Sequence, residues 1–74
     1  MKNNQFEIGD IIIGTECNYY GAANYDAIMV VESGKLFSWY MGVRIIFHKD
    51  KRYIGKYFCV DNNAELFKLL IGGM

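Results

Sequence analysis

The side chains suited to catalysis or metal binding are few in this chain and far apart in the sequence. His48 is the only histidine, and Cys17 and Cys59 are the only cysteines. A histidine-based zinc site needs several further ligands, and the two cysteines lack the close spacing of a zinc ribbon. A cysteine–histidine dyad would require the fold to bring distant residues together, and nothing in the spacing indicates this. We therefore expect no enzyme, no metal and no cofactor, with His48 exposed to solvent beside a turn and both thiols free.

Basic residues gather in the second half of the chain. Residues 1–34 contain one base and five acids, whereas residues 35–74 contain seven bases and three acids. Lysine and arginine interleaved with aromatic rings can bind single-stranded nucleic acid, through phosphate contacts and base stacking. The candidate residues for this alternative are Arg44, Lys49, Lys51, Arg52, Tyr53 and Lys56. A solvated hairpin tip, or an edge that meets an acidic protein surface, explains the same residues.

Tyrosines give a second signal, in a segment that fits no strand. Residues 16–26 contain three tyrosines and two asparagines. Loops of this length are uncommon in compact domains and are often functional, and tyrosine is enriched where proteins bind one another. We predict a binding face where this loop meets the outward side of a long curved strand at residues 36–48, made by Tyr19, Tyr20, Tyr25, Tyr40 and Arg44. The alternative is that the rings fold back and complete a small core.

Regular alternation predicts one long strand in the middle of the chain. Every second residue from 37 to 47 is large and apolar, a period typical of a strand with one buried face. We expect a strand from Leu36 to His48 in which Trp39, Val43, Ile45 and Phe47 are buried together. Gly42 lies at its midpoint and favours a bulge or a bend there, or a junction of two strands.

Shorter patterns predict the other elements of an all-β fold. We expect strands at residues 10–15, 27–32, 53–60 and 67–71, with turns at 33–35 and 49–52. Asp61 is a candidate cap for a short helical turn at residues 62–66. A helix from Ala64 to Ile71 is the alternative to the last strand, because its apolar spacing fits both.

The residues before the first strand carry a family resemblance. The stretch Phe6-Glu7-Ile8-Gly9-Asp10-Ile11-Ile12 resembles the Gly-Asp pair that often precedes the first strand of SH3-like and Tudor-like barrels. This resemblance implies a small SH3-like barrel of about five strands, whose long loop after the first strand lines a ligand groove. In size and composition the chain also resembles small phage and prophage proteins of Gram-positive bacteria. That resemblance implies a protein of the host cytoplasm.

Length and composition restrict the class of protein further. A chain of 74 residues makes a single domain, and a 53% hydrophobic content excludes a disordered chain. Eight bases balance eight acids, so net charge does not draw it to nucleic acid or membranes. With neither a signal peptide nor a membrane span in the sequence, we expect a cytoplasmic protein without a membrane partner. Because one small core cannot easily hide so many apolar side chains, we also expect a homo-oligomer.

Together these features favour a non-catalytic binding module that docks on another macromolecule, in the first place a protein. A phage-encoded accessory or inhibitor of a host system would have this form. The two alternatives are a nucleic-acid-binding barrel that uses the basic segment and a self-assembling structural protein.

Overall fold

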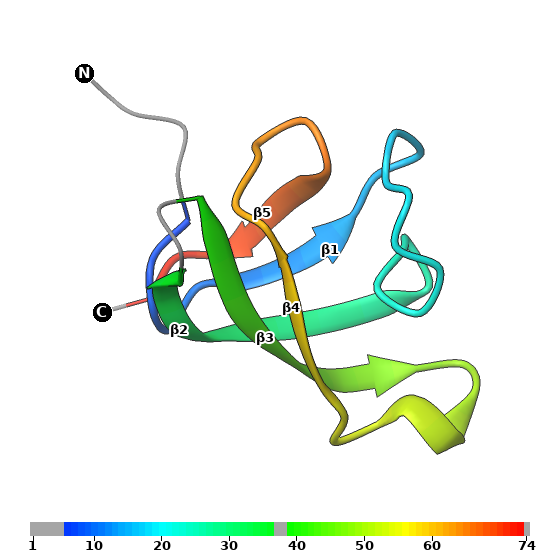
Figure 1. Cartoon of the computed structure of the whole chain (residues 1–74). Coiled ribbons are helices and arrows are strands. Elements are labelled where there is room, and N and C mark those ends of the chain that lie inside the picture. The colour runs from blue at the N-terminus through cyan, green and yellow to red at the C-terminus, as the bar shows by residue number, and fades with distance from the viewer. Residues whose placement is uncertain (1–5, 37–38, 74) are drawn as a thin grey trace.

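A computed structural model describes residues 6–36 and 39–73 and shows five antiparallel strands in one sheet (Figure 1). The strands are β1 (Ile11–Gly14), β2 (Ala27–Leu36), β3 (Tyr40–His48), β4 (Tyr57–Asp61) and β5 (Phe67–Ile71), in the sheet order β4-β3-β2-β1-β5. The only helical element in the described chain is the short 3-10 helix η1 (Lys51–Tyr53). The all-β expectation is confirmed. The sheet is not closed into a barrel, because in the described residues β4 and β5 each pair on one side only.

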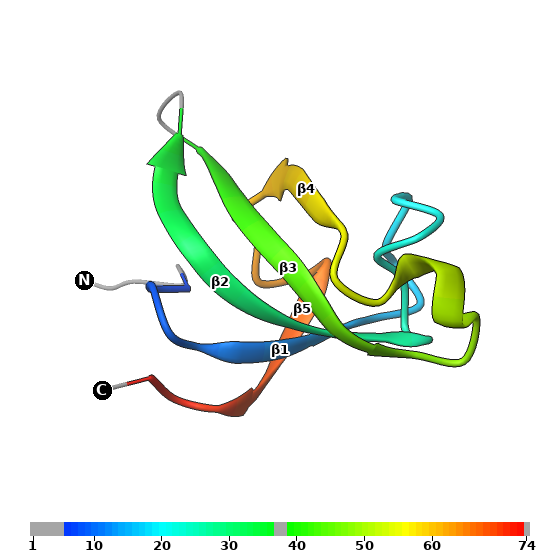
Figure 2. The same cartoon turned by 90° about the horizontal axis from the view of Figure 1, so that it is seen from below.

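The long strands β2 and β3 curve together and give the sheet a concave side (Figure 2). That side holds a single apolar core drawn from every strand and from the β1–β2 loop. The core residues are Ile12, Ala23, Ala27, Met29, Val31, Met41, Val43, Ile45, Val60, Leu66 and Phe67. No helix in the described part of the chain is long and apolar enough to span a membrane.

The β2–β3 hairpin lies further along the chain than the sequence predicts. Leu36 belongs to the end of β2 and pairs with Tyr40, so the expected turn at residues 33–35 is part of a strand. The register shifts between Val31 and Ser33, which leaves Glu32 as an extra residue on β2. The sequence predicts a bulge at Gly42 of β3. The bulge lies opposite Gly42 instead, because the extra residue belongs to β2. Phe37, expected in the core, lies outside the described residues.

The predicted core of the long strand is half wrong. Val43 and Ile45 are fully buried, whereas Trp39 and Phe47 are 61% and 56% exposed. Met29 pairs with Ile45 and Ile28 with Phe47, so Ile46 has no partner and forms a β-bulge. After this extra residue, the side chains of β3 face the opposite side of the sheet from the one that the alternation predicts.

The reversal at Ile46 places Phe47 outside and His48, only 7% exposed, inside. The expectation of a solvent-exposed His48 is therefore wrong. Trp39 lies before the first residue of β3, where alternation along the strand does not determine its direction.

The C-terminal third also differs in detail from the prediction. Tyr53 lies in η1, and the strand expected at 53–60 begins only at Tyr57. Residues 67–71 form a strand, so the alternative helix is wrong. Asp61 ends β4, and the turn that follows is capped instead by Asn63, whose Oδ1 accepts a hydrogen bond from the Glu65 N–H at 2.8 Å.

A long irregular loop joins β1 to β2, as the sequence predicts. Gly14 ends β1 directly against this loop, because a Cβ at that position would overlap the backbone of Asn24. Ala23 enters the core, and Tyr20 packs against it. The loop therefore folds back on the concave side of the sheet and is held at defined points.

Candidate binding surface

Hydrogen bonds attach the first half of the β1–β2 loop to the turn before β5. The Thr15 hydroxyl donates to the Glu65 carbonyl at 2.6 Å, and the Asn18 amide donates to the Leu66 carbonyl at 3.0 Å. Asn18 Oδ1 in turn accepts from the Tyr20 N–H at 2.7 Å. This attachment fixes the direction in which the chain presents the next two tyrosines.

Tyr19 and Tyr20 both reach Asp61, at the end of β4. The Tyr19 hydroxyl donates to the Asp61 carboxylate, and the Tyr20 hydroxyl accepts from the Asp61 N–H at 3.1 Å. The two rings lie 4.6 Å apart between centroids and are tilted by 31°. Tyr20 is half-buried and supports Tyr19, which is 65% exposed.

Two further aromatic side chains lie on the other side of Asp61. Tyr40 is the cross-strand partner of Asp61, and partners of this kind project to the same side of a sheet. Trp39 lies beside Tyr40, with 6.2 Å between ring centroids, and its carbonyl accepts from the Asn62 N–H at 2.7 Å. We call the surface made by Tyr19, Trp39, Tyr40 and Asp61 the Asp61 surface.

The electrostatics of the Asp61 surface are acidic. The segments 15–24 and 57–67 on the Tyr19 and β4 side of it contain no lysine or arginine and carry Glu16, Asp61 and Glu65, whereas Lys35 and Arg44 flank Trp39 and Tyr40 in the sequence. The hydrogen bond to Asp61, assisted by that to Tyr20, raises the pKa of the Tyr19 phenol. Tyr19 therefore stays a neutral donor to the carboxylate.

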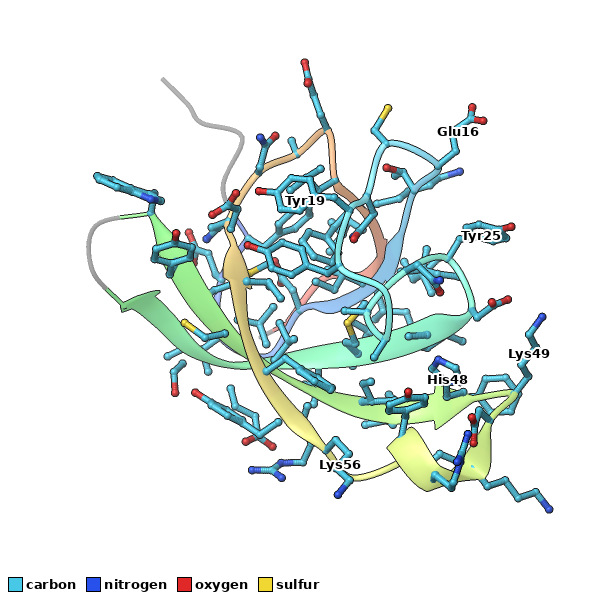
Figure 3. All side chains as sticks on the ribbon, turned by 45° about the vertical axis from the view of Figure 1, so that its right-hand side comes forward. Glu16, Tyr19, Tyr25, His48, Lys49 and Lys56 are labelled. Atoms are coloured by element: carbon cyan, nitrogen blue, oxygen red, sulfur yellow. The ribbon has the colours of Figure 1, made fainter. Side chains whose placement is uncertain are left out.

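The structure separates the other two residues of the predicted binding face from this surface. Tyr25 is exposed at the far end of the loop, well away from Tyr19 (Figure 3). Arg44 lies on the outward side of β3, where its Nε contacts the Glu32 carboxylate at 2.8 Å and its Nη1 donates to the Gly55 carbonyl at 2.8 Å.

A tyrosine from β4 lies between Arg44 and Tyr40. A Cβ at Gly42 would overlap the hydroxyl of Tyr57, so the missing side chain leaves room for that ring. Tyr57 also donates to the Ser33 hydroxyl at 3.1 Å and lies under the Arg44 guanidinium, 5.2 Å from it. Tyr40 and Arg44 share a strand face, but they do not form one site.

Most of the basic segment is engaged with acids. Arg44 pairs with Glu32, Lys49 with Asp26 at 3.5 Å, and Arg52 with Asp50 at 2.7 Å. Among the described residues, Lys51 and Lys56 form no ion pair. Figure 3 shows Lys49 and Lys56 on different parts of the η1 region, away from Tyr19. Tyr53 is half-buried and stacks on His48, with 4.9 Å between ring centroids, so its ring is turned toward the core.

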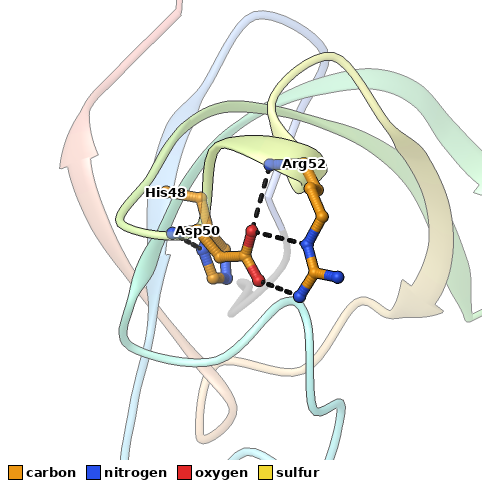
Figure 4. A network of polar contacts seen from close by, with 3 residues as sticks. All are labelled: His48, Asp50 and Arg52. Atoms are coloured by element: carbon orange, nitrogen blue, oxygen red, sulfur yellow. Dashed lines mark hydrogen bonds and ion pairs between the residues drawn. The ribbon is translucent and has the colours of Figure 1, made fainter.

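His48, Asp50 and Arg52 form a polar network that shapes this hairpin (Figure 4). His48 Nδ1 accepts from the Asp50 N–H at 2.9 Å, and Asp50 Oδ1 caps η1 by accepting from the Arg52 N–H at 3.1 Å. Two further bonds join the carboxylate to the Arg52 guanidinium. The Arg52 side chain, and then its backbone N–H, lower the pKa of Asp50 to about 2.

The candidates for nucleophilic or metal chemistry do not come together. Cys17 and Cys59 are both exposed free thiols. Among the described residues, no three histidine, cysteine or acidic side chains lie where they could hold a metal ion. His48 Nε2 is buried and has no hydrogen-bond partner in the described chain.

Sequence reasoning missed two members of the Asp61 surface. Trp39 fits the alternation of apolar residues in the long strand, which predicts that it is buried in the core. Its position beside a turn is the one feature of the sequence that indicates exposure. Asp61 was expected to cap a helical turn. Its contact with Tyr19 spans 42 residues, and nothing local in the sequence indicates it.

Comparisons with protein-family models, with curated proteins and with solved structures found no match.

Proposed function

We propose that this protein is a non-catalytic binding module that docks on a protein partner through the Asp61 surface. The observation that carries this proposal is the contact of Tyr19 with the Asp61 carboxylate at a position where Tyr40 is the cross-strand partner of Asp61 and Trp39 lies beside Tyr40. Exposed Trp and Tyr rings give a large contact area at low entropic cost and are enriched at binding hot spots. The proposal includes an SH3-like fold with an open sheet, in which the long loop after β1 borders the ligand surface.

The chemistry of the surface favours a partner segment that carries arginine or lysine. A cation beside aromatic faces is attracted by the ring quadrupole, and a nearby carboxylate adds to that attraction. The loop and β4 segments beside Tyr19 and Asp61 supply only negative charge, which favours basic partners and disfavours acidic ones. If the chain is a phage-encoded accessory or inhibitor, the partner is a host protein with such a segment.

The nucleic-acid alternative is supported less well. Three of its five bases are paired with acids, and the ring of Tyr53 is half-buried against His48. A segment that binds phosphates and stacks bases needs free cations and accessible aromatic faces.

Selection from a displayed library of random peptides tests the proposal. We expect enrichment of peptides that contain arginine or lysine beside apolar residues. Binding of a selected peptide should weaken at least about tenfold in Tyr19→Ala and in Trp39→Ala, the usual effect of truncating an anchor residue.

Tyr25→Ala is the matched control, because Tyr25 is as exposed as Tyr19 but lies away from the surface. It should bind the peptide as the parent does. Selection of acidic peptides, or equal binding by all three variants and the parent, would contradict the proposal.

A further inference from the structure

The convex side of the sheet presents an apolar face that no described segment covers. Ile13 of β1, Ile28 of β2 and Phe47 of β3 are cross-strand partners in one row, and Ile71, Ile11 and Val30 form the adjacent row. Ile11, Ile13, Ile28 and Val30 alternate with the buried Ile12 and Met29, so they project to the opposite side, and their cross-strand partners Phe47 and Ile71 project with them. β5, β1, β2 and β3 are consecutive neighbours in the sheet, and in Figure 2 no loop of the described chain is drawn in front of β1 and β2.

The bulge at Ile46 enlarges this face. Ile46 and Phe47 are consecutive and both exposed, so β3 adds two large side chains where a regular strand would add one. Together with Ile71 at 64% exposure, they border the half-buried isoleucines of β1 and β2. We call the surface made by Ile11, Ile13, Ile28, Val30, Ile46, Phe47 and Ile71 the convex face.

We propose that the convex face binds a second copy of this chain, forming a two-fold dimer with the two sheets packed face to face. An isologous interface requires a patch complementary to itself. An apolar patch without net charge meets this condition. The chain's formal net charge of zero opposes association less than a large charge would.

The charges around the convex face suit an interface with a polar rim. Lys68 pairs with Ile13 on the β5 side of the face, and Arg44 pairs with Val30 on the β3 side. Both therefore lie at its borders, and Arg44 is already neutralised by Glu32. Apolar centres with polar borders are typical of stable interfaces.

The size of the face fits a small dimer. Ile46, Phe47 and Ile71 are 47%, 56% and 64% exposed, and with the half-buried residues between them they form an apolar patch on the order of 300–600 Å², a size that often marks a functional surface. A standard interface buries roughly 800 Å² on each partner, so the polar border would join the apolar centre in the contact. The Asp61 surface, by contrast, is acidic and would repel its own copy.

Sedimentation equilibrium from low to high micromolar concentration tests the dimer. The parent should sediment as a monomer–dimer equilibrium. Phe47→Lys and Ile71→Lys should each raise the dimer Kd at least about tenfold, because each places an unpaired charge inside an apolar interface. Tyr19→Lys is the matched control, with a similarly exposed ring on another surface, and should leave the Kd unchanged.

The two variants lie at opposite borders of the convex face, so one decides the result if the other fails to fold. Circular dichroism establishes folding in each case. A parent that remains monomeric at high micromolar concentration would overturn the dimer. Dimerisation of the folded lysine variants with the parent's Kd would overturn the assignment to the convex face.

Discussion

Single residues set the local shape of the η1 hairpin, and Asp50 is central to it. Its carboxylate caps η1 and binds the Arg52 guanidinium, which is why its pKa is lowered to about 2. A lowered pKa means that the ionised carboxylate stabilises the folded state. That contribution is fully present above the unfolded value near 3.8 and is lost as pH falls toward about 2.

We predict that Arg52→Leu raises the pKa of Asp50 but does not restore it fully, since the backbone N–H of residue 52 still donates. An NMR titration of the Asp50 carboxyl carbon measures this. The difference in unfolding free energy between parent and variant should be constant above pH 4 and should shrink toward pH 2. A pKa unchanged by the substitution would contradict the assignment.

At the same scale, β3 shows how far alternation can be trusted. Met41, Val43 and Ile45 alternate as predicted, whereas Phe47 and His48 are reversed. The alternation of apolar residues in the sequence does not show whether a bulge has moved the later side chains to the other side of the sheet. Only the pairing of β3 with β2 determines which side they face. The same limit applies to Tyr19 and Asp61, whose contact depends on the fold of the whole chain.

We predict that Ile45→Ala lowers the free energy of unfolding by about 2–5 kcal/mol, the usual cost of a large buried aliphatic side chain. Phe47→Ala should lower it by less than about 1 kcal/mol, as expected for an exposed site. Urea unfolding at low micromolar concentration measures both. Equal losses would mean that the strand has no bulge at Ile46.

At the scale of elements, the β1–β2 loop matters most, because it brings Tyr19 and Tyr20 to Asp61. The sequence predicted its existence, its length and its tyrosines. It did not predict that Tyr20 supports the loop, that Tyr19 contacts Asp61 and that Tyr25 lies apart. These differences arise from attachments to residues far along the chain, such as Thr15 to Glu65.

Gly14 is the point at which β1 and this loop touch most closely. We predict that Gly14→Ala costs about 1–3 kcal/mol, the usual range for overpacking, because its Cβ would overlap the Asn24 backbone. Gly21→Ala is the control in the same loop, since a Cβ there meets nothing within 4 Å. Thermal melts of the two variants should differ clearly, and identical melts would show that the loop is not held against β1.

At the scale of the whole molecule, charge and apolar surface are divided among separate regions. Acids lie on the Tyr19 and β4 side of the Asp61 surface, bases gather near η1, and the convex face is largely uncharged. The charge asymmetry of the two halves was visible in the sequence. The ion pairs that neutralise much of the basic segment were not, because Glu32 and Asp26 come from the acidic half.

This pairing predicts weak binding to single-stranded DNA. With Lys51 and Lys56 as the unpaired bases of the basic segment in the described chain, about two phosphate contacts remain. The slope of log K against log salt should then be no steeper than about −1.5, at roughly 0.7 per contact. Fluorescence anisotropy with a labelled oligonucleotide measures it, and tight binding with a steep slope would favour the nucleic-acid alternative.

The central claim is that the Asp61 surface binds the partner, and an NMR chemical-shift map with a selected basic peptide tests it most directly. The account predicts that the largest amide shifts fall at Tyr19, at Trp39 and Tyr40, and at Asp61 and Asn62. Residues 49–56 and Tyr25 should shift little. Shifts concentrated around η1 or on the convex face, with the Asp61 surface unchanged, would contradict the claim.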